Sequence, residues 1–204
     1  MPQLECFFDC SSPWTYLGFH NIQPLAADLG VEITWRPILV GGLFNTINPS
    51  VYASRKNPVP AKQTYMHKDL QDWARYSGIN IRWPMSIFPI NSVKAMRGCI
   101  AADRQGKLVP YARGVFEAYW GLDRDITQDD LLAEIALAAG LDPNEISTAI
   151  GSDKIKAELK ANGEDLAQRG GYGSPTFFVN GDDMYFGNDR MPLIHSSLKA
   201  ALTA

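Results

Sequence analysis

The stretch FFDCSSPWTYLGF, residues 7–19, joins an apolar segment to a segment with helical spacing, and this junction decides the fold. Residues 3–10 alternate with period two and carry apolar side chains on both faces, which predicts a strand buried on both sides. Residues 13–30 predict a helix, which Pro24 is expected to kink or split. Residues 31–36 predict a second strand. The opening is therefore a β-α-β unit, and a right-handed crossover is expected.

The rest of the chain returns to strands only near its C-terminal end. A loop rich in Gly, Pro and Asn is expected over residues 37–61, and loops of that length are uncommon unless they bind something. Predicted helix starts include a capping box of Thr127 with Asp130, and caps at Asp142 and Ser152. The later elements are predicted as a helix over 62–77, an extended segment over 79–90, a succession of helices, strands over 175–180 and 184–186 joined by a turn, and a helix over 189–202.

The order β-α-β, a block of helices, then β-β-α is the connectivity of the thioredoxin fold. We therefore predict an α/β protein with a thioredoxin-like fold that carries a large all-helical insertion. The thioredoxin-like domain is predicted over residues 1–60 and 170–204, and the inserted helical domain over residues 61–169.

Composition excludes several classes of protein. The chain has 204 residues, of which 46% are hydrophobic, and a formal net charge of -3, so there is no electrostatic reason to expect a nucleic-acid partner. Three cysteines argue against a disulfide framework, and the three histidines lack the spacing of metal ligands, so no metal is expected. No leader precedes the first strand and no apolar run is long enough to span a membrane. We expect a soluble cytoplasmic protein without a membrane partner.

The first junction has the residue types of an anion site. Ser12-Pro13-Trp14-Thr15 stands where many redox proteins carry Cys-Pro-x-Cys, and the N-terminus of a helix favours an anion, including a thiolate. Ser12 is predicted as the N-cap with Pro13 in the first helical position, and a cap without further function is the structural alternative. Cys10 is interpreted as a small buried apolar residue.

Two later junctions carry polar residues beside predicted secondary structure. Gly173-Ser174-Pro175 leads into a buried strand and suggests a cis bond, which would turn the N–H and C=O of Ser174 toward the Ser12 junction, where an extended peptide could pair with them. Asn188 and Asp189 stand at the start of the last helix. They either cap that helix, or a carboxylate there holds the ammonium group of a small ligand.

Five stretches in this order, SSPWTYLGF, RPILVGGLF, PVPAKQTYMHKDL, GSPTFFV and FGNDRM, resemble the 2-hydroxychromene-2-carboxylate isomerases. They also resemble the related kappa-class glutathione transferases, and both groups belong to the superfamily of the periplasmic disulfide oxidoreductases. The resemblance spans essentially the whole chain. It implies glutathione as the cofactor and Ser12 as the catalytic residue, whose hydroxyl hydrogen-bonds the glutathione sulfur.

The resemblance also implies a set of glutathione-binding residues. Ser174 would pair through its backbone with the cysteinyl part, Asn188 and Asp189 would hold the γ-glutamyl end, and Lys62 would face the glycyl carboxylate. The family uses an asparagine from the long loop as well. Here we favour Asn48, with Asn57 as the alternative. The resemblance also implies a homodimer, because these families are typically dimeric.

The implied activity is a glutathione-dependent isomerisation in aromatic, naphthalene-like catabolism. The glutathione thiolate would add reversibly to a conjugated aromatic substrate and be eliminated unconsumed. The alternatives are a kappa-like transferase that conjugates glutathione to an electrophile, and a non-catalytic thioredoxin-like binding module in which Ser12 and Asp189 are only caps. Thiol–disulfide exchange is excluded at Ser12, because a serine cannot form a mixed disulfide.

Overall fold

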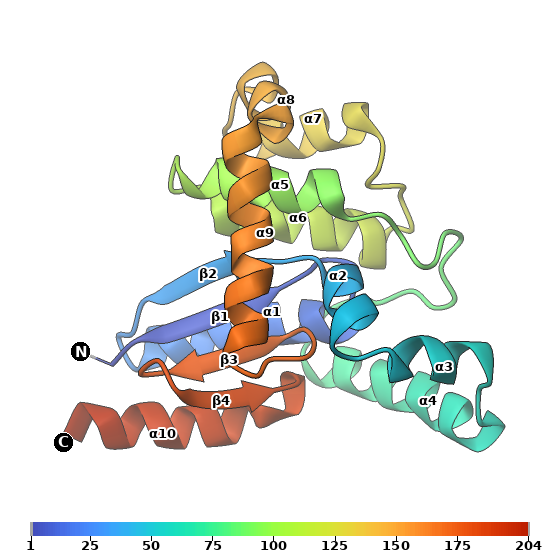
Figure 1. Ribbon diagram of the computed structural model, residues 1–204, viewed down its shortest axis with the longest axis vertical. Coiled ribbons are helices and arrows are strands. Elements are labelled where there is room, and N and C mark those ends of the chain that lie inside the picture. The colour runs from blue at the N-terminus through green and yellow to red at the C-terminus, as the bar shows by residue number, and fades with distance from the viewer. Residues whose placement is uncertain (1, 204) are drawn as a thin grey trace.

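A computed structural model describes residues 2–203, with the side chains of all but residues 44, 46, 52, 54 and 55. At its centre is a four-stranded sheet in the order β2-β1-β3-β4 (Figure 1). β1 pairs in parallel with β2, and β3 is antiparallel to both β1 and β4. Both predicted units, β-α-β and β-β-α, are present and share this sheet. The strands are β1 Leu4–Phe8, β2 Ile33–Pro37, β3 Thr176–Val179 and β4 Asp183–Phe186.

Helices make up most of the remaining chain. They are α1 Pro13–Asp28, α2 Val40–Thr46, α3 Ser50–Lys56, α4 Pro60–Tyr76, α5 Val93–Asp103, α6 Leu108–Phe116, the π-helical η1 Glu117–Gly121, α7 Asp129–Ala138, α8 Pro143–Gly151, α9 Asp153–Gln168, the 3-10 segment η2 Asn188–Arg190 and α10 Met191–Thr203. The predicted caps at Asp142 and Ser152 are confirmed, because both side chains accept a hydrogen bond from a backbone N–H in the first turn.

Two predictions about local structure were wrong, and a third was wrong in part. Residues 37–61 are not a plain loop, because α2 and α3 form within them. α1 is not split at Pro24, since burial of this helix against the sheet offsets the lost hydrogen bond, and a kink there stays a prediction. Thr127 is not part of a capping box: its hydroxyl donates to Asp125 at 2.6 Å, and α7 begins two residues later at Asp129.

Two layers of apolar side chains cover the sheet, as period-two alternation requires. The larger core holds Leu4, Cys6 and Phe8 of β1 with residues of α1, α5, α6 and α10. The smaller core holds Phe7 and Phe178 with residues of α2 and α9, and Figure 1 shows α9 crossing the front of the sheet. β1 is thus buried on both sides, as predicted. The division into residues 1–60 with 170–204 and an insertion over 61–169 stays a prediction.

The helices have lengths that are ordinary for globular proteins. Within residues 2–203, none combines the length and the hydropathy that a membrane span requires.

Candidate active site

Three chain junctions meet at one edge of the sheet, where β1 ends, β3 begins and β4 ends (Figure 1). Phe7 of β1 pairs with Thr176 of β3, which pairs in turn with Phe186 of β4. Ser12 follows the first of these strands within a few residues, Ser174 precedes the second, and η2 follows the third. The sheet register therefore brings together segments that are far apart in the sequence.

Ser12 is the N-cap of α1, as predicted. Its backbone is extended, with φ -110° and ψ 126°, and its Oγ accepts a hydrogen bond from the N–H of Thr15 at 3.3 Å. The N–H of Ser12 donates to the carbonyl of Asp9 at 3.3 Å, which closes the turn between β1 and α1. The cap uses a lone pair of the hydroxyl oxygen, and the hydroxyl proton has no acceptor within residues 2–203. This proton is available to an anion beside the helix N-terminus.

Thr15 occupies the second thiol position of the redox motif, and the fold uses it as a structural contact. Its side chain is fully buried, and its Oγ1 lies 2.8 Å from the Oγ of Ser174 in a hydrogen bond for which either hydroxyl can be the donor. Ser174 Oγ also accepts from the N–H of Asp9 at 3.0 Å. A hydroxyl pair therefore joins α1 to the segment before β3, and Ser12 belongs to the same network through Thr15.

The backbone of Ser174 is buried and unpaired. The Ser174–Pro175 bond is cis, as predicted, and within the described residues neither the N–H nor the C=O of Ser174 forms a hydrogen bond. The Pro175 ring packs on α1 at Gly18, where an added Cβ would lie only 2.7 Å from Pro175 Cγ. Ser174 thus offers an open donor and acceptor in the manner of a strand edge, which is a surface that an extended peptide can pair with, and their orientation toward the Ser12 junction stays a prediction.

Asn188 offers a further unpaired group. It begins η2, which packs against α1, and its side chain is only 5% exposed. Its Nδ2 has no hydrogen-bond acceptor in the part of the chain that the structure describes. Because an unsatisfied buried amide is unfavourable, this position suits an oxygen of a bound ligand. The neighbouring Asp189 is half exposed, and its Oδ2 lies 2.7 Å from Nη1 of Arg190.

The other predicted residues lie farther from the junction. Asn48, between α2 and α3, donates through Nδ2 to the carbonyl of Tyr172 at 3.4 Å, and Tyr172 is two residues before Ser174 in sequence. The alternative, Asn57, is exposed at the C-terminal end of α3. Lys62 is exposed in the first turn of α4, and no contact among residues 2–203 links it to the junction. The structure therefore connects Asn48, but not Lys62, to the Ser174 segment.

The cysteines are not positioned to react. Cys6, Cys10 and Cys99 are buried and form no disulfide bond. Burial raises the pKa of the Cys10 thiol well above its usual value, and the charge of Asp9 raises it further, so Cys10 does not supply a thiolate at the junction. Residues 2–203 contain no group of three His, Cys, Asp or Glu side chains arranged to hold a metal ion.

Sequence reasoning overlooked two residues that shape the junction. Asp9 is 1% exposed, and its carboxylate accepts hydrogen bonds from the backbone N–H groups of Ser11 and Val40. An aspartate at the end of a doubly apolar strand could have indicated this role. Trp120 donates from Nε1 to the carbonyl of Cys10 at 2.8 Å, and nothing in the sequence points to that contact across 110 positions.

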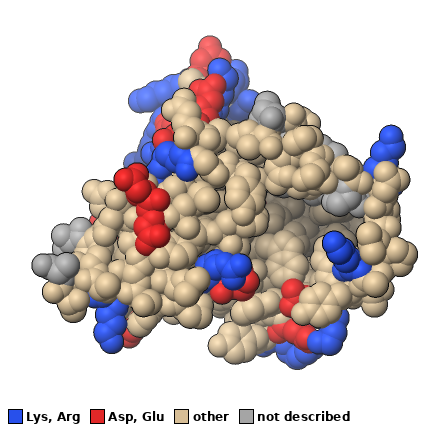
Figure 2. Space-filling view, turned by 60° about the horizontal axis from the view of Figure 1, so that its bottom comes forward, with Lys and Arg blue, Asp and Glu red and all other residues tan. Residues whose placement is uncertain are grey.

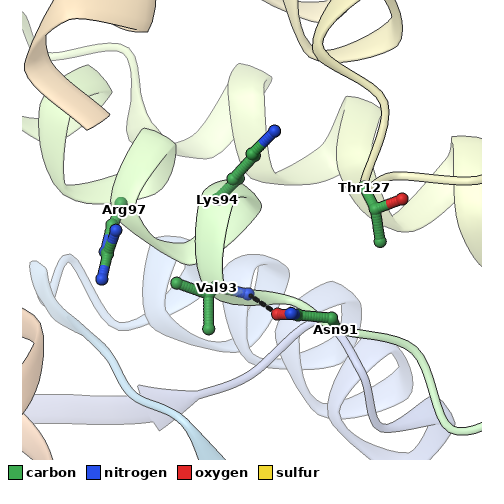
Figure 3. Close-up of a pocket in the computed structure, with 5 residues that line it drawn as sticks. All are labelled: Asn91, Val93, Lys94, Arg97 and Thr127. Atoms are coloured by element: carbon green, nitrogen blue, oxygen red, sulfur yellow. Dashed lines mark hydrogen bonds between the residues drawn. The ribbon is translucent and has the colours of Figure 1, made fainter. Parts of the chain in front are cut away.

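One face of the molecule is hollowed. Figure 2 shows a hollow between the lobe of α3 and α4 and the rest of the molecule, with charged side chains at its margin and a mostly uncharged floor. A separate pocket of about 310 Å³ lies at the N-terminal end of α5, lined by Asn91, Val93, Lys94, Arg97 and Thr127 (Figure 3). Lys94 there is ion-paired with Asp129 at 2.7 Å. None of the six predicted site residues lines this pocket, so it is not the predicted glutathione site.

Comparison with known proteins establishes the family. Residues 3–199 match the family model described as a DSBA-like thioredoxin domain. The chain belongs to the DSBA-like thioredoxin domain family. Within this family it is 26% identical to the 2-hydroxychromene-2-carboxylate isomerase of Pseudomonas putida over 198 residues, covering 96% of this chain and 93% of the relative. It is also 26% identical to glutathione S-transferase kappa 1 of Homo sapiens over 205 residues, covering 94% and 88%.

Solved structures share the fold of this chain. A 2-hydroxychromene-2-carboxylate isomerase superimposes with a TM-score of 0.81 at 24% identity, covering 98% of this chain and 95% of that one. A probable DsbA oxidoreductase from Streptomyces coelicolor superimposes with a TM-score of 0.79 at 20% identity, covering 100% and 91%. At these identities the likeness concerns the fold alone, and it confirms the predicted thioredoxin-like α/β architecture.

Proposed function

We propose that this chain is a glutathione-dependent isomerase of the 2-hydroxychromene-2-carboxylate type, acting in the catabolism of naphthalene-like aromatic compounds. One observation carries the proposal. The N-terminus of α1 keeps the geometry that stabilises a thiolate, while Ser12 and Thr15 replace both thiols of the redox motif. Such a site can activate the thiol of another molecule but cannot exchange disulfides itself. Relatives that bear the isomerase name match almost the whole chain.

The unpaired groups at the junction support glutathione as the ligand. The Ser12 hydroxyl proton, the backbone of Ser174 and Nδ2 of Asn188 lack partners among residues 2–203. A thiolate sulfur, a peptide group and a carboxylate would satisfy these three in turn, and glutathione carries all of them. We propose that Asp189 holds the ammonium group and that Asn48 contacts the peptide.

Lys62 has a weaker structural basis, because no described contact places it at the junction. We propose that it faces the glycyl carboxylate from the first turn of α4, where its ammonium group is exposed and unpaired among residues 2–203.

Ser12 would act by donating its hydroxyl proton to the sulfur in a hydrogen bond. Free thiols have a pKa near 8.5, so most of a thiol pool is protonated near neutral pH. A hydroxyl donor at a helix N-terminus favours the thiolate and lowers this pKa, and each unit corresponds to about 1.4 kcal/mol. The cap bond from Thr15 holds the Ser12 oxygen in place during this interaction. Glutathione bound there would supply a nucleophile that is not consumed.

A kappa-like transferase is the second candidate, because human kappa transferase matches this chain at the same 26% identity as the isomerase. The same Ser12 geometry would serve it. The two candidates differ in the fate of glutathione, which a transferase consumes.

We further propose a cytoplasmic homodimer. The resemblance to the isomerases and kappa transferases supports the dimer, and the composition supports the compartment. Light scattering of the purified chain tests the dimer, and a monomer at micromolar concentration would contradict it.

The test follows the absorbance of a hydroxychromene carboxylate with and without glutathione, while the total glutathione is measured. Isomerisation that requires glutathione and leaves its amount unchanged supports the proposal. Stoichiometric loss of glutathione would favour the transferase. If millimolar glutathione does not bind to the chain, both enzymes are excluded and the binding module remains.

A further inference from the structure

A buried carboxylate lies directly behind the Ser12 junction. Asp9, the residue after β1, is 1% exposed. Its Oδ1 accepts from the N–H of Ser11 at 2.9 Å, and its Oδ2 accepts from the N–H of Val40 at 2.9 Å. The side chain of Ser92, just before α5, hydrogen-bonds the same carboxylate. Asp9 is therefore bonded to three segments: the turn into α1, the start of α2 and the start of α5.

This carboxylate is unfavourable for stability by itself. Burial of a charge is costly unless the charge is paired, and no cation pairs with Asp9 among the described residues. Hydrogen bonds from two backbone N–H groups and a hydroxyl compensate for part of that cost. An apolar residue would fill the same space without a charge. A stability argument alone therefore does not account for an aspartate at this position.

The bonds of Asp9 determine where the candidate catalytic hydroxyl lies. Its carboxylate holds Ser11, its carbonyl accepts from the N–H of Ser12 at 3.3 Å, and its N–H donates to Ser174 Oγ at 3.0 Å. The two sides of the predicted glutathione site are thus tied to one residue. A shift of Asp9 would displace Ser12 relative to Ser174.

We propose that Asp9 is a positioning residue for the reaction, which acts by holding the Ser12 hydroxyl in register with the Ser174 backbone. This proposal rests on the proposed glutathione-dependent function. Asp9 itself touches no ligand in this scheme. Its role requires the carboxylate and not merely a side chain of that size, because both of its oxygens accept from N–H donors. An asparagine would place an NH2 group against one of these donors.

The decisive variants are Asp9→Asn, Ser12→Ala and the double variant. Glutathione affinity is measured by calorimetry, turnover by the absorbance assay, and stability by urea unfolding. Asn162→Ala is the control, because Asn162 is also buried, at 6% exposed, and donates to the carbonyl of Pro37 at 3.0 Å, with no hydrogen bond to Asp9, Ser12 or Ser174 among the described residues. Ser92→Ala removes one partner of Asp9 and serves as the milder variant if Asp9→Asn does not fold.

We expect Asp9→Asn to lower turnover about tenfold to a hundredfold, as a displaced catalytic group does. We also expect it to weaken glutathione binding. In the Ser12→Ala background the same substitution should change turnover less than about threefold, because the group that it positions is already absent. Ser92→Ala should act in the same direction by a smaller factor. Asn162→Ala should lower stability and leave turnover and affinity unchanged.

Two results would overturn the proposal. If Asp9→Asn changes stability alone, as Asn162→Ala does, or if its effect on turnover is the same with and without Ser12, Asp9 has only a structural role. In either case the wild-type chain still binds glutathione and turns over, so the proposed function survives. If the wild-type chain binds no glutathione at millimolar concentration, the proposed function fails, and the positioning role that depends on it is overturned as well.

Discussion

The hydroxyl network between α1 and β3 predicts that two similar substitutions have unequal effects on stability. Ser174 Oγ accepts from the N–H of Asp9 and shares a hydrogen bond with Thr15 Oγ1, so it serves two partners. Thr15 Oγ1 shares only that one side-chain bond among residues 2–203. Ser174→Ala therefore leaves the N–H of Asp9 and the hydroxyl of Thr15 unpaired, whereas Thr15→Val, which keeps the side-chain shape, leaves unpaired only one donor or acceptor function of the Ser174 hydroxyl, whose oxygen still accepts from Asp9.

The magnitudes follow from the number of groups left unpaired. A buried donor or acceptor without a partner costs about 1–3 kcal/mol, so we expect roughly 1–2 kcal/mol for Thr15→Val and roughly 2–4 kcal/mol for Ser174→Ala. In a chain of this size, each kcal/mol lowers the melting temperature by about 2–4 °C. The double variant should lose less than the sum of the two, because the shared bond is counted in both single variants.

Urea unfolding followed by circular dichroism measures these losses of free energy. The shared hydroxyl network is contradicted if Thr15→Val destabilises the chain as much as Ser174→Ala, or if the two losses add fully. Either outcome would mean that Ser174 does not connect Asp9 and Thr15 in solution.

Three other predictions concern packing and charge. Gly18→Ala should lower the free energy of unfolding by about 1–3 kcal/mol and lower turnover, because the new Cβ would lie 2.7 Å from the Pro175 ring. The control Gly163→Ala, in open space on α9, should stabilise the chain by up to about 1 kcal/mol, and equal effects of the two variants in urea unfolding would contradict this. Arg169→Ala should lower the free energy of unfolding by about 2–4 kcal/mol, because the guanidinium donates hydrogen bonds to Glu5 at 2.6 Å and to the Gly181 carbonyl at 2.7 Å and lies 3.7 Å from the centre of the Phe178 ring. The control Lys160→Ala breaks only an exposed ion pair with Glu164 and should cost less than about 1 kcal/mol. A melting temperature that Arg169→Ala leaves unchanged would contradict this prediction. Burial raises the pKa of Asp9 above its usual 3.8, although its hydrogen bonds oppose this, so the folded chain binds this proton more tightly than the unfolded chain. The contribution of Asp9 to stability is therefore greatest below pH 3.8 and decreases as the pH rises through the raised pKa. Asp9→Asn should remove this decrease of stability with pH, since burial keeps the pKa of both neighbouring thiols, Cys10 and Cys99, far above this range. If the difference in unfolding free energy between the wild type and Asp9→Asn is constant with pH, the raised pKa of Asp9 is contradicted.

Strong local patterns in the sequence predicted the frame of the fold. Alternation over residues 3–10, the Ser12-Pro13 cap and the late strand pair were enough for the order of strands and helices around the sheet. Gly30 ends α1 with φ 65°, and the N–H of Val31 donates to the carbonyl of Ala26, which is the C-terminal motif that a glycine at this position predicts. These features depend on neighbours in sequence, so they can be read without the tertiary structure.

Features that depend on tertiary contacts were missed. α2 has two glycines and no side-chain cap, so its sequence is a weak helix pattern. It forms because Val40 and Leu43 pack in the smaller core and the N–H of Val40 donates to Asp9. The bonds of Asp9 join residues up to 165 positions apart, and no local pattern predicts them. The closeness of the Ser12 and Ser174 segments was inferred from the expected fold, and the contact through Thr15 was not.

The most direct test of the central claim compares two N-cap serines. Ser12 caps α1 and Ser152 caps α9, each by accepting a bond in the first turn. Ser12→Ala and Ser152→Ala should each cost about 1 kcal/mol of stability through loss of the cap. Turnover of the hydroxychromene carboxylate with glutathione is then measured for both. We expect a large loss of turnover for Ser12→Ala, with turnover of Ser152→Ala near that of the wild type. Equal turnover in the two variants would show that Ser12 is only a helix cap and would contradict its proposed catalytic role.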